Sequence, residues 1–189
     1  ILERLDPSVS DKIIVVDLNA INIKNLGTMR PVGFSRPFGP SWAELFINNK
    51  PLRIARWPND STMAMGEILD KGSVPRDGDF SNKGGAFRYS TDRPKKWKNQ
   101  NDIWVSGYFG FGWAEDAVEL EEIDTVNSVF KTKQPSLYGF KTGQKFHRWF
   151  VYNILEEVDE PGEYYIDRTE GKIYFYPNEE IKELEISVL

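Results

Sequence analysis

The strongest constraint on the fold is a hairpin signal between residues 43 and 57. The strand-like stretch 44–47 (ELFI) runs into Asn48-Asn49, and a second strand-like stretch returns over residues 51–57. Asparagine tolerates the positive φ that a tight hairpin turn requires. This segment therefore predicts an antiparallel β-hairpin.

Strand-like segments recur along the rest of the chain, whereas helical patterns are short. Tyr164-Tyr165-Ile166, a turn, and residues 172–176 predict a second hairpin. Aromatic residues make up 14% of the chain and favour strands. Further strands are predicted at residues 13–18, 86–89, 103–109, 118–123, 128–131, 145–153 and 184–188, with helical turns at 1–12 and 154–158. The predicted class is all-β, an antiparallel β-sandwich or partly open barrel with short helical turns and long loops.

Two parts are expected along the chain, packed as one compact unit. Residues 1–40 are predicted to be a lead-in segment with one strand at 13–18, buried because it is apolar and β-branched, followed by a Pro/Gly-rich connector. Residues 41–189 are predicted to be an antiparallel β accessory domain. The chain begins at Ile1 and its last predicted strand has no visible end, so we expect a piece of a larger protein.

The composition excludes several classes of function. The net charge is −5, which lacks the basic excess of a nucleic-acid-binding protein. There is no Cys, so disulfides and thiolate metal sites are ruled out. No apolar run approaches the roughly 18 residues that a membrane span needs. We therefore expect no nucleic-acid partner and no membrane span.

No motif in the sequence predicts a catalytic centre, a metal site or a cofactor. His147 is the one histidine, and it lies in an aromatic strand-like segment where a structural role is expected. A glycosidase needs two convergent carboxylates, but neighbours such as Glu115 and Asp116 point to opposite faces of a strand. Asp77-Gly78-Asp79 lacks the remainder of a calcium loop and is interpreted as a turn. Catalytic, metal and cofactor residues are all predicted to be none.

Aromatic side chains are the candidates for carbohydrate contact, because flat rings stack on the apolar faces of sugars. Trp97 lies in the basic segment 93–98 and is expected to be the most exposed. Basic residues around an aromatic ring can bind nucleic acid or an acidic polysaccharide, but in an acidic chain such a segment is more often a solvated loop. Trp57 lies in a predicted strand, where a core position is expected. The candidate contact residues are Trp97, Trp113, Trp57 and Arg56.

Several segments, in order along the chain, resemble a family of large bacterial proteins. They are 44–59 (ELFINNKPLRIARWPN), 102–109 (DIWVSGYF) followed by Trp113-Ala114, 153–168 (NILEEVDEPGEYYIDR), and 171–177 (GKIYFYP). This pattern is similar to the right-handed parallel β-helix glycoside hydrolases and related proteins, including α-L-fucosidase- or xylanase-type members. Asn49 stands where the family usually has Gly, and Tyr164 where it usually has Trp.

The resemblance implies an antiparallel β domain inserted into or attached to a β-helix of the same polypeptide. The catalytic carboxylates are then expected on the β-helix, outside this chain. The implied function is a non-catalytic accessory domain of a secreted, extracellular or periplasmic, polysaccharide-degrading protein, shaping or flanking the substrate cleft, with a polysaccharide or oligosaccharide as a possible partner. Two alternatives stay open, an independent carbohydrate-binding module and a purely structural interaction domain.

Overall fold

The computed structural model describes residues 2–39, 43–98 and 101–187, which form two compact units. Unit 1 comprises residues 1–29, 38–56 and 153–189, and unit 2 comprises residues 30–37 and 57–152. The segment 1–29 thus belongs to the same unit as the C-terminal strands. Helices are confined to single turns, and no helix in the described ranges is long and apolar enough to cross a bilayer.

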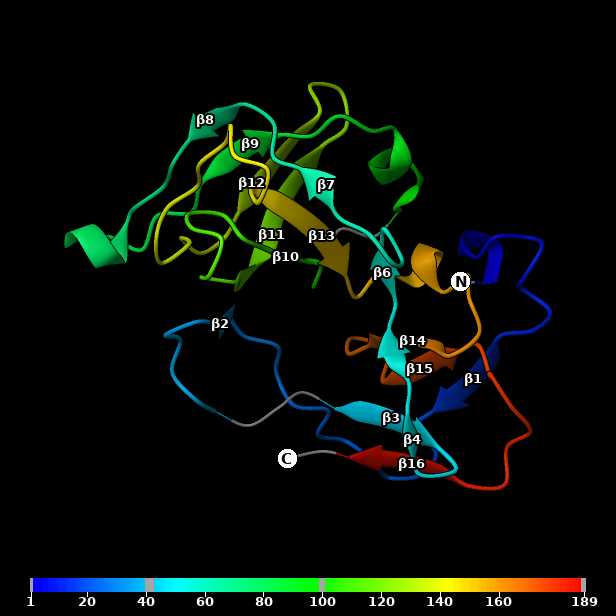
Figure 1. Cartoon of the computed structure of the whole chain (residues 1–189). Helices are drawn as coiled ribbons and strands as arrows, with labels where there is room; N and C mark the ends of the chain where they lie inside the picture. The colour runs from blue at the N-terminus through cyan, green and yellow to red at the C-terminus, as the bar shows by residue number, and fades with distance from the viewer. Residues whose placement is uncertain (1, 40–42, 99–100, 188–189) are drawn as a thin grey trace. The chain divides into compact units, whose positions relative to one another are not determined.

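Unit 1 is built on two small sheets (Figure 1). The first has the strand order β1-β15-β14-β5 and is antiparallel except for the parallel pair β14–β5. The second has the order β16-β3-β4 and is antiparallel. The strands are β1 (Ile14–Asp17), β3 (Glu44–Ile47), β4 (Lys50–Pro51), β5 (Arg53–Ile54), β14 (Glu163–Asp167), β15 (Lys172–Phe175) and β16 (Leu184–Ser187).

The four-stranded sheet of unit 1 has apolar residues on both faces. On one face Tyr164 and Ile166 share a core cluster with Leu45 and Ile47 of β3. On the other face Tyr165 packs in a second cluster with Leu5, which follows the 3₁₀ turn η1 (Leu2–Arg4), and with Leu155 of the turn η4 (Leu155–Glu157). Every residue of β14 is therefore buried, since successive side chains of a strand point to opposite faces.

Both predicted hairpins are present, and the turn chemistry of the first is as expected. The return arm of the first is shorter than the predicted stretch 51–57, since Lys50–Pro51 pair with β3 whereas Arg53–Ile54 pair with β14. Asn48 and Asn49 have φ of 50° and 63°, which closes the two-residue turn between β3 and β4. The predicted burial of the strand at 13–18 was wrong. Strand β1 is a sheet edge on which Ile14 and Val15 are 38% and 41% exposed, while Val16 alone of the three packs on the core.

Unit 2 contains one large antiparallel sheet, whose strands β8 to β13 are drawn in green to yellow in Figure 1. Its strand order is β6-β13-β10-β11-β12-β9-β8, with β2 on β11 and β7 on β13. The strands are β2 (Val32–Gly33), β6 (Arg56–Trp57), β7 (Met63–Ala64), β8 (Ile68–Asp70), β9 (Ala86–Arg88), β10 (Trp104–Gly107), β11 (Asp116–Asp124), β12 (Val129–Thr132) and β13 (Arg148–Tyr152). Strands β2, β7 and β8 were not predicted, because segments of two or three residues are too short to carry a period.

Aromatic rings fill the core of unit 2. Phe130 has its ring centroid 5.7 Å from that of Phe87 and 5.2 Å from that of Trp149, both in edge-to-face orientation. Phe140 stands 5.6 Å from Phe87 and 4.9 Å from Phe109. Such pairs add to the burial of the rings themselves. The all-β class with antiparallel pairing, short helical turns and long loops is therefore confirmed, and its aromatic content is explained in large part by this core.

Candidate functional site

The expectation that Trp97 is the most exposed of the candidates was wrong. Its side chain is 3% exposed. The basic segment folds into the 3₁₀ turn η3 (Arg93–Lys96), and the backbone N–H of Trp97 donates to the carbonyl of Pro94. This turn lays the indole parallel to Phe130, at 6.4 Å and an interplanar angle of 13°. A ring covered in this way has no free face for a sugar.

Trp57 and Arg56 form β6 and are both partly exposed. The ring of Trp57 stands 6.4 Å from Trp97 and 6.0 Å from Trp149, so its contacts are those of a core margin. Trp104 is 1% exposed and donates its indole N–H to Asp102 at 2.9 Å. None of these rings belongs to an open aromatic surface.

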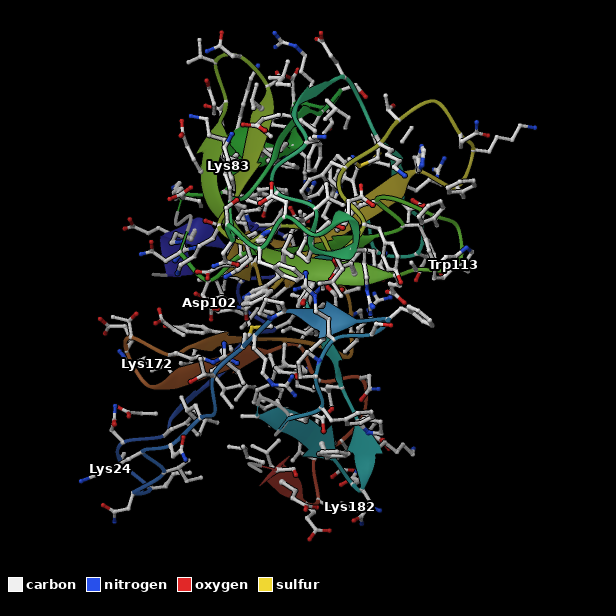
Figure 2. All side chains as sticks on the ribbon, turned by 90° about the vertical axis from the view of Figure 1, so that its left-hand side faces the viewer. Lys24, Lys83, Asp102, Trp113, Lys172 and Lys182 are labelled. Carbon is white, nitrogen blue, oxygen red and sulfur yellow. The ribbon has the colours of Figure 1, made fainter. Side chains whose placement is uncertain are left out.

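Trp113 is the predicted contact residue that the structure places on the surface. Its side chain is 57% exposed, and Figure 2 shows it at the periphery of unit 2. Three rings surround it. Phe111 lies parallel to it at 5.3 Å and 9°, Phe34 is edge-on at 5.1 Å and 80°, and Tyr138 is edge-on at 5.3 Å and 76°. We call Phe34, Phe111, Trp113 and Tyr138 the aromatic patch.

The aromatic patch is the candidate site because its rings remain accessible although they touch one another. Phe34 is 50% and Phe111 is 38% exposed, and Tyr138 is half-buried. Exposed clusters of large apolar side chains mark interaction surfaces in soluble proteins. The patch is also flanked by cations, with Lys141 Nζ 4.2 Å from the centroid of Phe111 and Arg76 Cζ 5.6 Å from that of Tyr138.

Three segments distant in sequence supply the patch, and backbone hydrogen bonds join them. The N–H of Phe34 donates to Glu115 O at 2.8 Å, and the N–H of Lys141 donates to Phe109 O at 2.9 Å. Within the middle segment the N–H of Ala114 donates to Phe111 O at 3.1 Å. The residues around 34, 111–113 and 138–141 are therefore held in fixed register.

A buried ion pair braces the same three segments. Arg36 Nε and Nη2 donate to the two carboxylate oxygens of Asp116 at 2.8 and 3.0 Å. Arg36 also donates to Pro135 O at 2.8 Å, and the N–H of Leu137 donates to Asp116 at 2.9 Å. The Arg36 and Asp116 side chains are only 11% and 4% exposed. We call this pair the clamp, because it ties the Phe34 and Tyr138 segments to the start of β11.

Glycines allow the close approach of backbones beneath the patch. A Cβ on Gly110 would lie 2.6 Å from the Cβ of Tyr138, and one on Gly33 would lie 2.3 Å from Glu115 O. The sequence carries a related signal, the mixture of Gly and aromatic residues over 107–112, which is typical of a chain crossing close to another backbone. Phe111 lies within that segment but was not itself predicted. Phe34, Tyr138 and Lys141 were missed because they come from remote loops without a local pattern.

His147 is buried next to Gly110, in the structural role expected of it. Its ring is 4% exposed, and Nδ1 accepts a hydrogen bond from the N–H of Gln144 at 3.3 Å. Nε2 stands 3.5 Å from Gly110 O. With Nδ1 accepting, the ring proton is assigned to Nε2, facing that carbonyl.

Unit 2 also has a concavity of about 580 Å³ between β8, β9, β11 and β12, which we call the β8–β12 groove. Figure 2 shows Lys83, which lines it, well away from Trp113. Its basic residues are neutralised, since Lys83 pairs with Asp70, Arg88 with Glu67 and Lys131 with Glu122. It presents no exposed aromatic cluster among its lining residues. It is therefore a solvated groove and a weaker candidate than the patch.

The most strongly perturbed carboxyl, in unit 1, is sealed from solvent. Burial raises the pKa of Glu163 to about 7, against hydrogen bonds from the Glu160 and Asp159 N–H groups and the charge of Arg53. Arg53 Nη2 donates to it at 3.0 Å. A carboxyl group whose pKa lies near neutral pH can serve as an acid or base, but Glu163 is 1% exposed, so no substrate reaches it. Among the described residues no cluster of three or more His, Cys, Asp or Glu could hold a metal ion.

Among the comparisons with known proteins, only the comparison with solved structures finds a similarity, and that similarity is one of fold. No protein-family profile matches the chain, and no curated protein matches it. A solved structure described as "Glycoside hydrolase" is similar with a TM-score of 0.52 and 16% sequence identity, over 93% of this chain and 28% of that one. This chain thus spans little more than a quarter of that protein, and it shares the fold of a portion of a glycoside hydrolase.

Proposed function

We propose that the chain is a non-catalytic accessory domain of a larger, secreted carbohydrate-active protein, and that the aromatic patch is its glycan contact. The observation that carries the proposal is a braced cluster of exposed rings with Trp113 at its centre. The structural similarity to part of a glycoside hydrolase supports a carbohydrate-related role.

The chemistry of the patch suits a sugar. A pyranose ring has an apolar face of C–H groups and a polar rim of hydroxyls. The parallel rings of Trp113 and Phe111 offer flat apolar surface, and Tyr138 adds a phenol at its edge. Because the clamp fixes the contributing segments, little conformational freedom is lost on binding, and such preorganisation increases affinity.

The accessory role rests on the engagement of the nearby carboxylates. Asp116 is 3% exposed and accepts its hydrogen bonds from Arg36 and the Leu137 N–H. Glu115 accepts from the Ser106 hydroxyl at 3.2 Å. Hydrolysis of a glycoside needs two carboxyl groups that face the scissile bond. We therefore assign catalysis to another part of the larger protein, for which the sequence resemblance suggests a parallel β-helix exported from the cell.

Binding and turnover measured on the same preparation test the proposal. The 189-residue chain is titrated calorimetrically with a panel of xylan, pectic and fucosylated oligosaccharides, and each mixture is assayed for released reducing sugar. We expect binding without turnover. Trp113→Ala should weaken it by about tenfold or more, equivalent to about 1.4 kcal/mol. Phe111→Ala should act in the same direction.

Val126→Ala is the matched control, because Val126 is 90% exposed in the turn at the far end of β11 from Asp116. This variant should bind as the wild type does. Turnover by the isolated chain would contradict the accessory role. Absence of binding across the panel would contradict glycan contact and would favour the purely structural alternative.

A further inference from the structure

The electrostatic surroundings of the aromatic patch differ from those of the chain as a whole. The net charge is −5, yet the charged side chains that contact the patch rings are Lys141 and Arg76. Within the described ranges neither of them forms an ion pair with a carboxylate, unlike the lysines and arginines of the β8–β12 groove. The charge at the patch therefore stays available to a ligand.

The acidic residues next to the patch do not cancel this charge. Asp116 is neutralised by Arg36 in the clamp. Glu115, its neighbour, turns to the Ser106 hydroxyl. A ligand at the patch thus meets cations directly, while the adjacent carboxylates are occupied in holding the loops.

Lys141 is placed for a ligand that stacks on the rings. Its ammonium lies over the ring of Phe111 at 4.2 Å, while Trp113 lies parallel to that ring at 5.3 Å. The cation–π contact limits the freedom of a side chain that is otherwise flexible and exposed. Phe111 therefore contacts both the ammonium and the indole on which the sugar would stack.

We infer that the aromatic patch selects an anionic sugar, whose pyranose face stacks on Trp113 and whose acidic group pairs with Lys141. Arg76 then attracts the next charged sugar unit of the same glycan. This inference rests on the proposed glycan contact and names its chemical class. A uronic acid carboxylate and a sugar sulfate share the required chemistry. Either would form a charge-assisted hydrogen bond with the ammonium.

Calorimetric titration with three matched probes tests the inference: oligogalacturonate for the carboxylate, a chondroitin sulfate oligosaccharide for the sulfate, and xylo-oligosaccharide as the neutral reference. At about 20 mM salt we expect at least one anionic probe to bind about fivefold or more tighter than the neutral one. The advantage should shrink at about 300 mM salt, because surface charges are screened. The tighter of the two anionic probes identifies the acidic group.

Two substitutions separate charge from stacking. Lys141→Gln should weaken binding of the preferred anionic probe about three- to fivefold, as expected for an exposed ion pair, and should weaken binding of the neutral probe by less than about twofold. Trp113→Ala should weaken the binding of both the anionic and the neutral probe by about tenfold or more. The matched control is Lys131→Gln, a lysine of β12 paired with Glu122, which should change neither affinity.

The outcomes distinguish this inference from the proposed function. If neutral and anionic probes bind equally and Lys141→Gln has no effect, the inference is overturned while glycan contact at Trp113 stands. If no probe binds, both are overturned, and self-association of the chain that Trp113→Ala abolishes would assign the patch to a protein interface. Anionic preference that survives Lys141→Gln would also overturn the assignment to this lysine.

Discussion

Removing the carboxylate of the clamp should destabilise unit 2 and loosen the aromatic patch together. In Asp116→Ala the guanidinium of Arg36 keeps its bond to Pro135 O but loses both carboxylate bonds, in a site where its side chain is 11% exposed. The N–H of Leu137 loses its acceptor as well. Breaking a buried pair by deleting one partner costs about 3–5 kcal/mol. Because Arg36 retains one bond, we expect the lower end, about 3 kcal/mol.

Equilibrium urea unfolding followed by tryptophan fluorescence measures this loss, which should appear as a lower midpoint with an unchanged m-value. The informative control is the double variant Arg36→Met with Asp116→Leu, which leaves no buried charge unpaired. It should lose about 1–2 kcal/mol relative to the wild type, less than Asp116→Ala, because only the Leu137 N–H and Pro135 O are then left without a partner. Hydrogen exchange of the amides at 33–36 and 136–141 should accelerate in Asp116→Ala. A loss under about 1 kcal/mol for Asp116→Ala, or equal losses for the single and double variants, would refute the clamp.

Three further perturbations test other parts of the structure. Burial raises the pKa of Glu163 to about 7, so between about pH 4.5 and 7 the folded state holds a proton that the unfolded state has released, and the free energy of unfolding should fall by up to about 3 kcal/mol as the pH rises through this range. In Glu163→Gln the contribution of this group to the pH dependence of the unfolding free energy should vanish. An unchanged pH dependence would place the titration at another group. Gly107→Ala puts a Cβ 2.0 Å from a carbonyl of β13 and should lower the free energy of unfolding in urea by about 3 kcal/mol or more. Gly143 has φ of 95° and open space around it, so Gly143→Ala should lower it by only about 1 kcal/mol. Similar losses for the two variants would disprove the steric explanation. Trp97→Ala should cost about 3–5 kcal/mol in stability because the ring is buried, whereas Trp113→Ala should cost little, and the reverse order would contradict the assignment of core and surface.

Local sequence signals predicted the elements of the fold well where the chemistry was local. The Asn48-Asn49 turn and the hairpin of β14 and β15 depend on neighbours in sequence, and both were predicted. Burial was harder to predict. The run 14–17 is apolar enough for a core strand, but its exposure follows from a place at the sheet edge that pairing with β15 decides.

The candidate site was only partly predictable for the same reason. Trp113 was named from the sequence, and the Gly–aromatic alternation marked its loop. Trp97 was misjudged because its basic neighbours suggested a solvated loop, whereas the η3 turn directs the ring inward and the lysines outward. Phe34 and Tyr138 join the patch through pairing with β11 and through the clamp, which are long-range events without a local signature.

The chain order of the two units has a consequence for synthesis on the ribosome. Unit 1 is interrupted by residues 57–152, and the interruption is closed where the N–H of Asn153 donates to Ala55 O at 2.9 Å. Among the described strands β1 pairs with β15 alone, so it must wait until Lys172–Phe175 have emerged. Unit 2, whose early segment 30–37 is already available, can complete its sheet before that point.

We therefore expect vectorial folding in which the middle of the chain becomes structured first and the first strand is secured last. During that interval Ile14 and Val15 lie on an unpaired strand, which is the kind of segment that nascent chains expose to aggregation and to chaperones. Pulse proteolysis of ribosome-stalled chains with residue 152 just outside the exit tunnel should find unit 2 protected and residues 1–29 cleaved. Protection of residues 1–29 at that length would show that β1 finds a partner before β15 is made.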